Sequence, residues 1–321
     1  VDFACVNRVE LDRQHLANVD LVISVGGDGT VLSAAHFLDH GTIPLLGINS
    51  DPISRDESES VDKTSTDERR SHGALCMCTS HDMADGLSRV LYGGGNLSTR
   101  TRIQTTVKST FSETRLVPAL NDLLIAHPCP SSVSRFRMGL LEEVTTDVAS
   151  SLADEGPGVK VESGERHVYG NDFRHFSRQD TDQEVPVSKV PLSKQYGTVT
   201  RFGGIAYDVK NSINVWSSGM WVSTSTGSSA AIASAGGQVM DLDSHHLQYL
   251  VREHMIESGA DDKVRKAGHD FLSNGEQLHL RWNSGVGKIY IDGAHLAHKL
   301  ELGDEILINA SAPPLQLFLR G

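Results

Sequence analysis

The feature that most constrains the fold is a glycine-rich turn, VGGDGT at residues 25–30, which joins two segments of different character. The run LVISV before it is β-branched and has the length of a strand. The segment VLSAAHFLD after it has the apolar spacing of a helix. The sequence therefore predicts a strand, a tight turn and a helix, a unit typical of parallel α/β sheets.

The residue types in this turn point to a ligand. Gly26, Gly27 and Gly29 allow backbone conformations closed to other residues and let the main chain approach a bound group closely. A helix that starts here would present free N–H groups and its positive dipole end to an anion. Asp28 would repel that anion, so its carboxylate is better explained as a group that takes up a proton. A glycine turn that merely packs is the alternative, and neither a P-loop nor a G-x-G-x-x-G pattern is present.

Composition narrows the class of partner. The 321 residues carry a net charge of −12, which argues against nucleic acid or an anionic membrane surface and favours a protein that binds small molecules. No apolar run is long enough to span a bilayer, and no signal peptide is visible. Because the chain begins at Val1, we expect that its ends are incomplete. The cytoplasm is the expected compartment, with a peroxisome or mitochondrion open if targeting signals have been lost.

The four cysteines favour a reduced intracellular compartment, because they form no CxxC pair and no disulfide-framework spacing. Cys76 and Cys78, with His72 and His81 nearby, match no common zinc pattern. No protein metal site is therefore predicted.

Two different sequence patterns divide the chain into expected domains. Over residues 1–104, strands such as IPLLGIN (43–49) alternate with helical segments such as MADGLSRVLYG (83–93), which predicts an α/β domain with a parallel sheet. Over 105–321, short segments such as QTTVKS, KIYIDG, DEILINA and LQLFLR predict a mostly antiparallel β domain. The polar stretches 54–71 and about 141–205 lack periodicity, and we expect a mobile loop and a disordered insertion there.

Two further motifs carry polar groups suited to a nucleotide. In ALNDLLIAH, Asn121 and Asp122 interrupt an apolar run and could bind a sugar diol, although an Asn-Asp turn is an equal alternative. In VSTSTGSSAAIASAGG (222–237), Thr226, Ser228 and Ser229 offer hydroxyl groups at an expected helix start. Close packing of small residues is the alternative reading of that motif.

The three motifs in this order resemble the NAD kinase family. GGDGT at 26–30, the Asn-acidic pair at 121–122 and the TGSSA turn leading into SAGG are its diagnostic stretches. LGINSDP (46–52), LQYLVRE (247–253) and YIDG (290–293) also resemble the plant and algal branch, whose known members prefer NADH.

The resemblance implies an α/β plus β fold: an N-terminal Rossmann-like domain and a C-terminal β-sandwich-type domain, with the active site between them. It implies transfer of the γ-phosphate of ATP, as its magnesium complex, to the 2′-hydroxyl of the adenosine ribose of NADH or NAD⁺. It implies that Asp28 is the general base, and that the enzyme is a homodimer or higher homo-oligomer. The residues that the resemblance assigns to nucleotide binding are Gly26, Gly27, Gly29, Thr30, Asn49, Asn121, Asp122, Thr226, Gly227, Ser228, Ser229, Ala230, Ser234 and Asp292.

Several departures from the family pattern affect details. Ser218 and Ala231 stand where many members carry an Asp and a Tyr, and the usual Gly-x-Leu-Gly-Phe-Leu after the LGIN strand is not found. Loss of a carboxylate near a nicotinamide site would relax selection for the positive charge of NAD⁺, which is a hypothesis for NADH preference. Asp292-Gly293 could equally be an ordinary hairpin turn.

Two other functions remain as alternatives. Lipid kinases of the diacylglycerol kinase type share a GGDGT turn, but they leave the TGSSA to SAGG stretch unexplained. A non-catalytic dinucleotide sensor would keep the pocket and lack turnover, and the intact GGDGT argues against it.

Overall fold

The structure of the chain is a computed structural model, and it describes residues 2–52, 73–143, 199–256 and 267–320. The chain divides into two compact units, one of Val1–Glu142 with Val209–Gly321 and one of Glu143–Asp208. The loop expected at 54–71 and most of the insertion expected at 141–205 lie outside the described residues.

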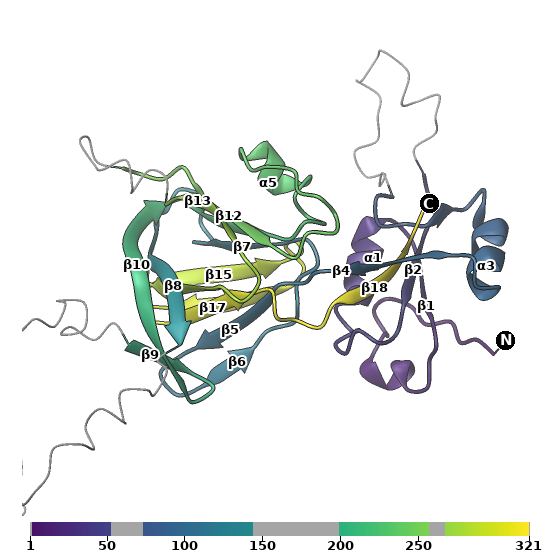
Figure 1. Cartoon of the computed structure of the whole chain (residues 1–321), viewed down its shortest axis with the longest axis horizontal. Coiled ribbons are helices and arrows are strands. Elements are labelled where there is room, and N and C mark those ends of the chain that lie inside the picture. Colours follow the sequence, from purple (N-terminus) through teal and green to yellow (C-terminus); the bar gives the residue numbers. More distant parts are fainter. Residues whose placement is uncertain (1, 53–72, 144–198, 257–266, 321) are drawn as a thin grey trace, which may run out of the picture. The chain divides into compact units, whose positions relative to one another are not determined.

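The first unit contains the predicted α/β sheet (Figure 1). Its order is β1-β2-β18-β4, and β3 also pairs with β2. β1, β3 and β18 run parallel to β2, whereas β4 is antiparallel to β18. The strands are β1 (Val22–Val25), β2 (Leu45–Asn49), β3 (Cys78–Thr79), β4 (Asn96–Arg100) and β18 (Leu315–Leu319).

The position of β18 corrects the sequence interpretation, which placed LQLFLR among the antiparallel strands. In the structure Leu317 pairs with Leu45 of β2 in parallel. Leu315 and Leu317 are fully buried with residues of the helix that follows β1, whereas Phe318 packs with a second cluster. A strand inside such a sheet needs apolar side chains on both faces. The alternation of apolar and polar residues in LQLFLR does not show which sheet the strand joins.

Short helices accompany this sheet: η1 (Arg13–Leu16), α1 (Asp28–Ala35) and α3 (Met83–Leu91). Val31 and Ala35 of α1 share a core cluster with Leu315 and Leu317, and Leu87 and Val90 of α3 pack in the cluster that contains Phe318. The helix expected after the glycine turn is confirmed, but it begins earlier, at Asp28. Within the described residues, no helix has the length and apolar character needed to cross a membrane.

Two antiparallel sheets form the β-rich part of the first unit, as predicted. One has the order β6-β5-β17-β14-β8-β10, and the other has six strands in the order β13-β12-β11-β7-β15-β16. The strands are β5 (Gln104–Lys108), β6 (Glu113–Arg115), β7 (Asp122–Ala126), β8 (Ser134–Glu143), β10 (Ile205–Ser217), β11 (Gly219–Ser223), β12 (Leu247–Arg252), β13 (His269–Leu272), β14 (Gln277–Trp282), β15 (Val286–Ile291), β16 (Ala297–Glu301) and β17 (Glu305–Asn309).

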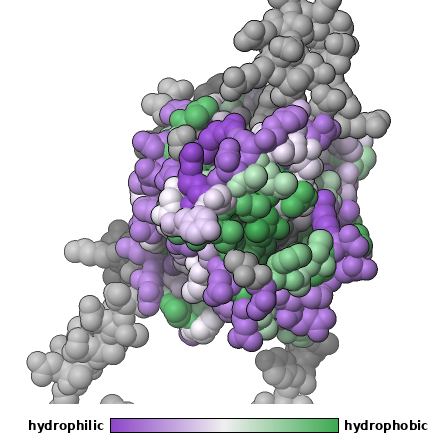
Figure 2. Space-filling view, turned by 90° about the vertical axis from the view of Figure 1, so that its right-hand side faces the viewer, coloured by the Kyte–Doolittle hydropathy of each residue, from purple (hydrophilic) through white to green (hydrophobic). Residues whose placement is uncertain are grey.

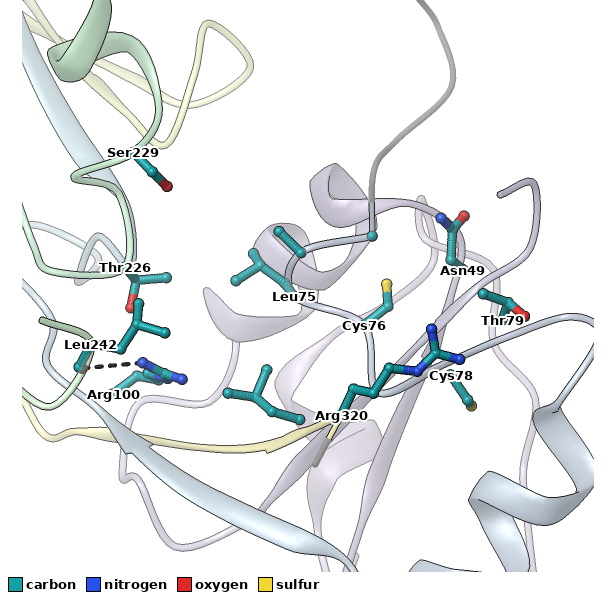
Figure 3. Close-up of a pocket in the computed structure, with 13 residues that line it drawn as sticks. Asn49, Leu75, Cys76, Cys78, Thr79, Arg100, Thr226, Ser229, Leu242 and Arg320 are labelled. Carbon is teal, nitrogen blue, oxygen red and sulfur yellow. Dashed lines mark hydrogen bonds between the residues drawn. The ribbon is translucent and has the colours of Figure 1, made fainter. Parts of the chain in front are cut away.

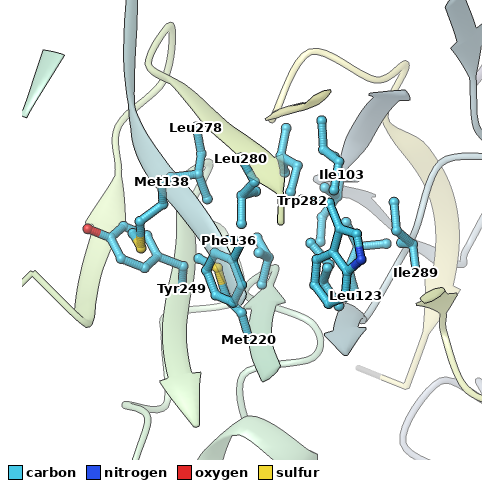
Figure 4. Close-up of a cluster of buried hydrophobic side chains, with 14 of the residues drawn as sticks. Ile103, Leu123, Phe136, Met138, Met220, Tyr249, Leu278, Leu280, Trp282 and Ile289 are labelled. Atoms are coloured by element: carbon cyan, nitrogen blue, oxygen red, sulfur yellow. The ribbon is translucent and has the colours of Figure 1, made fainter. Parts of the chain in front are cut away.

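Apolar side chains of both sheets form one large core (Figure 4). On β14, Leu278, Leu280 and Trp282 are fully buried at alternate positions, as expected for a strand with one face in a core. Trp282 stacks on Phe136 of β8 with ring centroids 6.2 Å apart. This packing holds β7, which begins at the second motif, and β11, which leads into the third motif.

Both ends of the expected insertion are strands, which corrects the sequence interpretation. β8 continues to Glu143, and β9 (Val199–Phe202) begins again at the far end. In the second unit, β9 pairs with the first residues of β10, with Gly203 and Gly204 at positive φ between them. Alternating burial along β8 and β9 supports strands there, although the sequence is polar.

The edge strand β1 leaves apolar residues uncovered. Ile23 and Val25 are 43% and 61% exposed. Figure 2 views the molecule from the side on which Figure 1 draws β1 and α3, and apolar residues gather there with hydrophilic residues around them. We attach no function to this surface.

Candidate active site

The glycine turn lies at the carboxyl end of β1, where ligands of parallel sheets usually bind. The Gly26 N–H donates to the Ile48 carbonyl at 2.9 Å, so the turn lies beside the end of β2. Gly26 has φ +154°, and a Cβ there would lie 2.3 Å from Thr30 Oγ1. Gly27 is the N-cap of α1 and has no side chain to cap it. The strand-turn-helix prediction is therefore confirmed, and Gly26 is required by the turn itself.

Asp28 is held by a segment that the sequence interpretation missed. Its carboxylate accepts backbone hydrogen bonds from Ala74 at 3.1 Å and from Leu75 at 2.8 Å. This segment then forms β3 beside β2. Gly73-Ala74-Leu75 has the Gly-x-Leu spacing that the family pattern places after LGIN, but here it follows the charged stretch 54–71, and cysteines stand at 76 and 78.

A cavity of about 350 Å³ lies next to this segment (Figure 3). Asn49, Thr79 and Arg320 come from the carboxyl ends of β2, β3 and β18, while Thr226 and Ser229 come from the third motif. Leucines supply apolar walls suited to a flat ring. The full lining is Asn49, Gly73, Ala74, Leu75, Cys76, Cys78, Thr79, Arg100, Thr226, Ser229, Leu242, Leu319 and Arg320.

Cys76 places a thiol between the cavity and Asp28. Its Sγ lies 3.8 Å from the Gly26 carbonyl and 4.0 Å from Asp28 Oδ1. Burial, with the negative charge of Asp28 and then Cys78 adding to it, raises the pKa of Cys76 to about 12. The thiol is therefore protonated at neutral pH, where it is a weak donor to these oxygens and a poor nucleophile.

Asp292 organises a second cluster. Its carboxylate accepts backbone N–H bonds from Leu120 at 2.9 Å, Asn121 at 2.7 Å and Asp122 at 3.1 Å. It also lies 2.8 Å from Nε2 of His36, which follows α1. Asp292 therefore fixes the start of β7 and connects it to the end of the helix that carries Asp28.

Arg102 completes this cluster at the end of α1. Its guanidinium is fully buried and donates to the carbonyls of Pro313 at 2.7 Å, Ala35 at 3.2 Å and Leu38 at 2.9 Å. Carbonyls at a helix end lack partners within the helix, so a buried cation is a favourable cap. Burial lowers the pKa of Arg102 to about 10, with Asp39 and Asp292 opposing the shift. We name Asp292, His36 and Arg102 the Asp292 joint.

Asp122, the acidic member of the second motif, is 8% exposed. Burial, reinforced by the charge of Asp292, raises the pKa of Asp122 to about 7. A carboxyl group with this pKa exchanges its proton near neutral pH, so it can accept or donate a hydrogen bond to a hydroxyl.

The second and third motifs meet at Gly227. A Cβ at Gly227 would lie 2.2 Å from the Asn121 carbonyl, so only glycine fits this approach. The Thr224 N–H and the Ser223 hydroxyl donate to the same carbonyl, at 2.9 and 3.2 Å. Asn121 Oδ1 is buried and has no partner within the described ranges.

The remaining residues of the third motif have different environments. Ser228 is buried, and its hydroxyl donates to the Ser225 carbonyl and accepts from the Met240 N–H, which are structural contacts. Ser229, Ala230 and Ser234 are exposed. The helix expected here is reduced to α5 (Ala231–Ser234), preceded by turns from residue 225.

The structure thus groups the predicted residues into three sets. Gly26, Gly27, Asp28, Gly29 and Thr30 lie at the head of α1; Asn121, Asp122, Gly227 and Asp292 lie together at the start of β7; Asn49, Thr226 and Ser229 line the cavity.

The cavity also contains residues that the sequence interpretation did not assign to a nucleotide site, chiefly Cys76, Arg100 and Arg320. The Gly-x-Leu spacing at residues 73–75 is a signal that could have pointed to Cys76, which follows it directly. The two arginines carry no local signal.

Ser218, invoked for NADH preference, lies just before β11, between it and β10, whereas Thr226 and Ser229 follow the end of β11. Its hydroxyl donates to the Glu253 carboxylate. A carboxylate therefore stands beside position 218 although the residue itself is serine, which weakens the explanation of NADH preference by loss of charge there.

Comparisons with known proteins identify the family. Residues 5–51 match the ATP-NAD kinase N-terminal domain. The chain is 33% identical over 319 residues to the probable NADH kinase of Oryza sativa subsp. japonica, covering 99% of this chain and 76% of the rice protein. It is also 33% identical over 319 residues to the NADH kinase of Arabidopsis thaliana, with 99% and 78% covered.

Solved structures show the same fold. Yeast NADH kinase complexed with NADH superposes with a TM-score of 0.60 at 14% identity, covering 97% of this chain and 64% of the yeast chain. An NAD kinase from Archaeoglobus fulgidus in complex with ATP gives a TM-score of 0.54 at 16% identity, covering 95% and 80%. Because 33% of its residues are identical, over 99% of its length, to those of two plant proteins named as NADH kinases, the chain belongs to the NAD kinase family.

Proposed function

We propose that this protein transfers the γ-phosphate of ATP to the 2′-hydroxyl of the adenosine ribose of NADH, and less efficiently of NAD⁺. The observation that carries the proposal is the position of Asp28. Its carboxylate stands at the head of α1, oriented by two backbone amides of the segment that lines the cavity. A base fixed beside a nucleotide-sized space is what transfer to a hydroxyl requires.

The residues around Asp28 supply the other parts of the reaction. At the amino end of α1, Gly27 and Gly29 present backbone N–H groups to phosphate oxygens, while the N–H groups of Gly26 and Thr30 hold the turn together. Phosphoryl transfer depends mainly on alignment and on neutralising charge, with the base accepting the hydroxyl proton. ATP enters as its magnesium complex, which is the substrate form expected for a kinase.

The second motif is proposed to hold the dinucleotide. Asn121 Oδ1 lacks a protein partner among the described residues, and Asp122 has a pKa of about 7. An amide and a titrating carboxyl group suit ribose hydroxyls, which both donate and accept. Asp292 is proposed to act through its three backbone contacts, which place this pair.

NADH preference rests on the likeness to the rice and Arabidopsis proteins named NADH kinase. The test is a phosphorylation assay with Mg-ATP that offers NADH and NAD⁺ separately and detects the products with an NADP-specific dehydrogenase. Product from NADH well above product from NAD⁺ supports the proposal. Equal rates remove the preference, and no product from either removes the kinase function. The Ser218→Asp variant tests the carboxylate explanation, since an unchanged NADH to NAD⁺ ratio would discard it.

We also propose a homodimer or higher homo-oligomer that acts in the cytoplasm. The four cysteines are all free thiols, and Cys76 and Cys78 are buried in that form, which suits a reducing compartment. Light scattering coupled to gel filtration measures the first property, and cell fractionation measures the second.

A further inference from the structure

Two buried arginines, two residues apart in sequence, have different surroundings. Arg102 is 0% exposed and donates through three nitrogens to three carbonyls. Arg100, at the end of β4, is 4% exposed, and its Nη1 donates to the Leu242 carbonyl at 3.1 Å. Arg100 Nε is buried and has no partner within the described residues. A guanidinium has five N–H donors, so Arg100 is far less satisfied than Arg102.

Burying the Arg100 guanidinium with so few hydrogen-bond partners costs free energy. Burial lowers its pKa, and Asp243 is the group that opposes this shift. A buried charge that lacks hydrogen-bond partners is unfavourable, so a chain that keeps arginine here must gain something from it. Packing at the end of α1 accounts for Arg102. No comparable contact accounts for Arg100 among the residues described.

Arg100 lines the cavity, and Figure 3 places it beside Thr226 and Leu242. Thr226 Oγ1 is likewise buried without a partner in the part of the chain that the structure describes. Arg320 lies with Cys78, Thr79 and Asn49 in Figure 3, and its guanidinium is paired with Asp82. Of these two cavity arginines, Arg320 therefore has a carboxylate partner, while Arg100 has positive charge and donors to offer a ligand.

We propose that Arg100 is a phosphate-binding residue of this cavity, which takes the diphosphate of an adenine nucleotide. This rests on the proposed kinase function and adds a residue to it. The planar fork of a guanidinium matches phosphate oxygens and makes charge-assisted bonds to them. ATP and NADH both carry a diphosphate on adenosine, so either nucleotide is a source of this group. The apolar side chains of Leu75 and Leu242 offer a surface for the rest of the nucleotide.

The test compares calorimetric binding of ADP and adenosine, which differ in the diphosphate. We expect Arg100→Gln to weaken ADP binding by about 10- to 100-fold, the range for hydrogen bonds to a charged group, and to leave adenosine binding unchanged. Arg100→Lys keeps the charge without the fork and should fall between. Arg89→Gln removes an equal charge from an exposed position in the last turn of α3 and should bind ADP as the parent protein does.

Unchanged ADP affinity in folded Arg100→Gln overturns the proposal. If that variant does not fold, Arg100→Lys decides: weaker ADP binding supports the proposal, and parental binding overturns it. Thermal unfolding without ligand establishes folding in each case.

Steady-state kinetics then identify which nucleotide, ATP or NADH, places its diphosphate at Arg100. A higher KM for ATP or for NADH in the Arg100 variants supports the site and names its nucleotide, and unchanged values for both overturn it. ADP binding needs no turnover, so the kinase function and the role of Arg100 are tested separately. A parent protein without kinase activity refutes the kinase function. The ADP measurement still decides whether Arg100 binds phosphate.

Discussion

The cavity and the Asp292 joint are both built from buried polar groups, but they differ in how completely those groups are paired. In the joint, Asp292 accepts three backbone N–H groups and lies against His36, while Arg102 donates to three carbonyls. In the cavity, Arg100 Nε and Thr226 Oγ1 are buried without partners within the described residues. Paired groups stabilise the fold, whereas unpaired groups beside a cavity are available to a ligand.

This contrast predicts which measurement each region affects. Variants of the joint should lower the free energy of unfolding, because they leave buried partners unpaired. Variants near the cavity should lower activity or affinity with little loss of stability.

The largest expected effect is on turnover. Asp28→Asn should lower the turnover number by about 10²- to 10⁴-fold, because the amide cannot take up the hydroxyl proton. Dinucleotide affinity should change little. The amide oxygen can keep one of the two backbone hydrogen bonds, and loss of the other should lower thermal stability modestly. Asp85→Asn, an exposed change in the first turn of α3, is the matched control. Parental turnover in Asp28→Asn would exclude this residue as the base.

The largest expected effect on stability is in the joint. Asp292→Ala should lower the free energy of unfolding by about 3 kcal/mol or more, because three buried backbone N–H groups lose a charged acceptor. Asp304→Ala is the matched comparison: Asp304 is also buried, and its carboxylate accepts the Glu301 N–H. Its loss should cost about 1 kcal/mol. Urea unfolding measures both, and equal costs would contradict the role of the joint.

Two glycines of the turn should respond in opposite directions. Gly26→Ala places a Cβ 2.3 Å from Thr30 Oγ1 and should destabilise the fold by about 2 kcal/mol. At Gly29 a Cβ would meet nothing within 4 Å, so Gly29→Ala should stabilise α1 by about 1 kcal/mol.

We expect Gly29→Ala nevertheless to raise the KM for ATP, because the added methyl group stands where a phosphate approaches. Thermal unfolding and steady-state kinetics on the same two proteins separate the effects. An unchanged KM in Gly29→Ala would show that its glycine does not serve the ligand.

The last expected effect is a slope of the free energy of unfolding with pH. The pKa of Asp122 is raised from 3.8 to about 7 in the folded protein. Between these values the folded state binds a proton that the unfolded chain does not, so the free energy of unfolding falls as pH rises and levels off above about 7. The slope from one proton is at most about 1.4 kcal/mol per pH unit.

Asp122→Asn should remove this contribution to the slope. Urea unfolding of both proteins at several pH values between 4 and 8 provides the measurement. Identical slopes in the two proteins would show that Asp122 does not titrate in this window.

The sequence interpretation succeeded where neighbouring residues decide the structure. The turn at Gly26 to Thr30, the helix after it and the strands flanking Asn49 and Asp122 follow from local patterns. It failed where the partner lies far along the chain: β18 joins β2 across about 270 residues, a pairing that the alternation of LQLFLR does not specify. The Gly73 to Leu75 segment was missed because a charged stretch separates it from LGIN in sequence while β3 returns it to β2 in space.

By itself, the sequence determined the three motifs, the family that they resemble and the residue at the head of α1 that can take up a proton. It determined these because each motif is a run of adjacent residues whose backbone needs and chemistry can be read together. Tertiary structure decided what each buried charge meets: the carbonyls of Ala35, Leu38 and Pro313 for Arg102, backbone amides for Asp292, and a cavity for Arg100. The physical reason is that a buried charge pairs with groups that folding brings together from distant parts of the chain. Residue type alone does not show which groups those are.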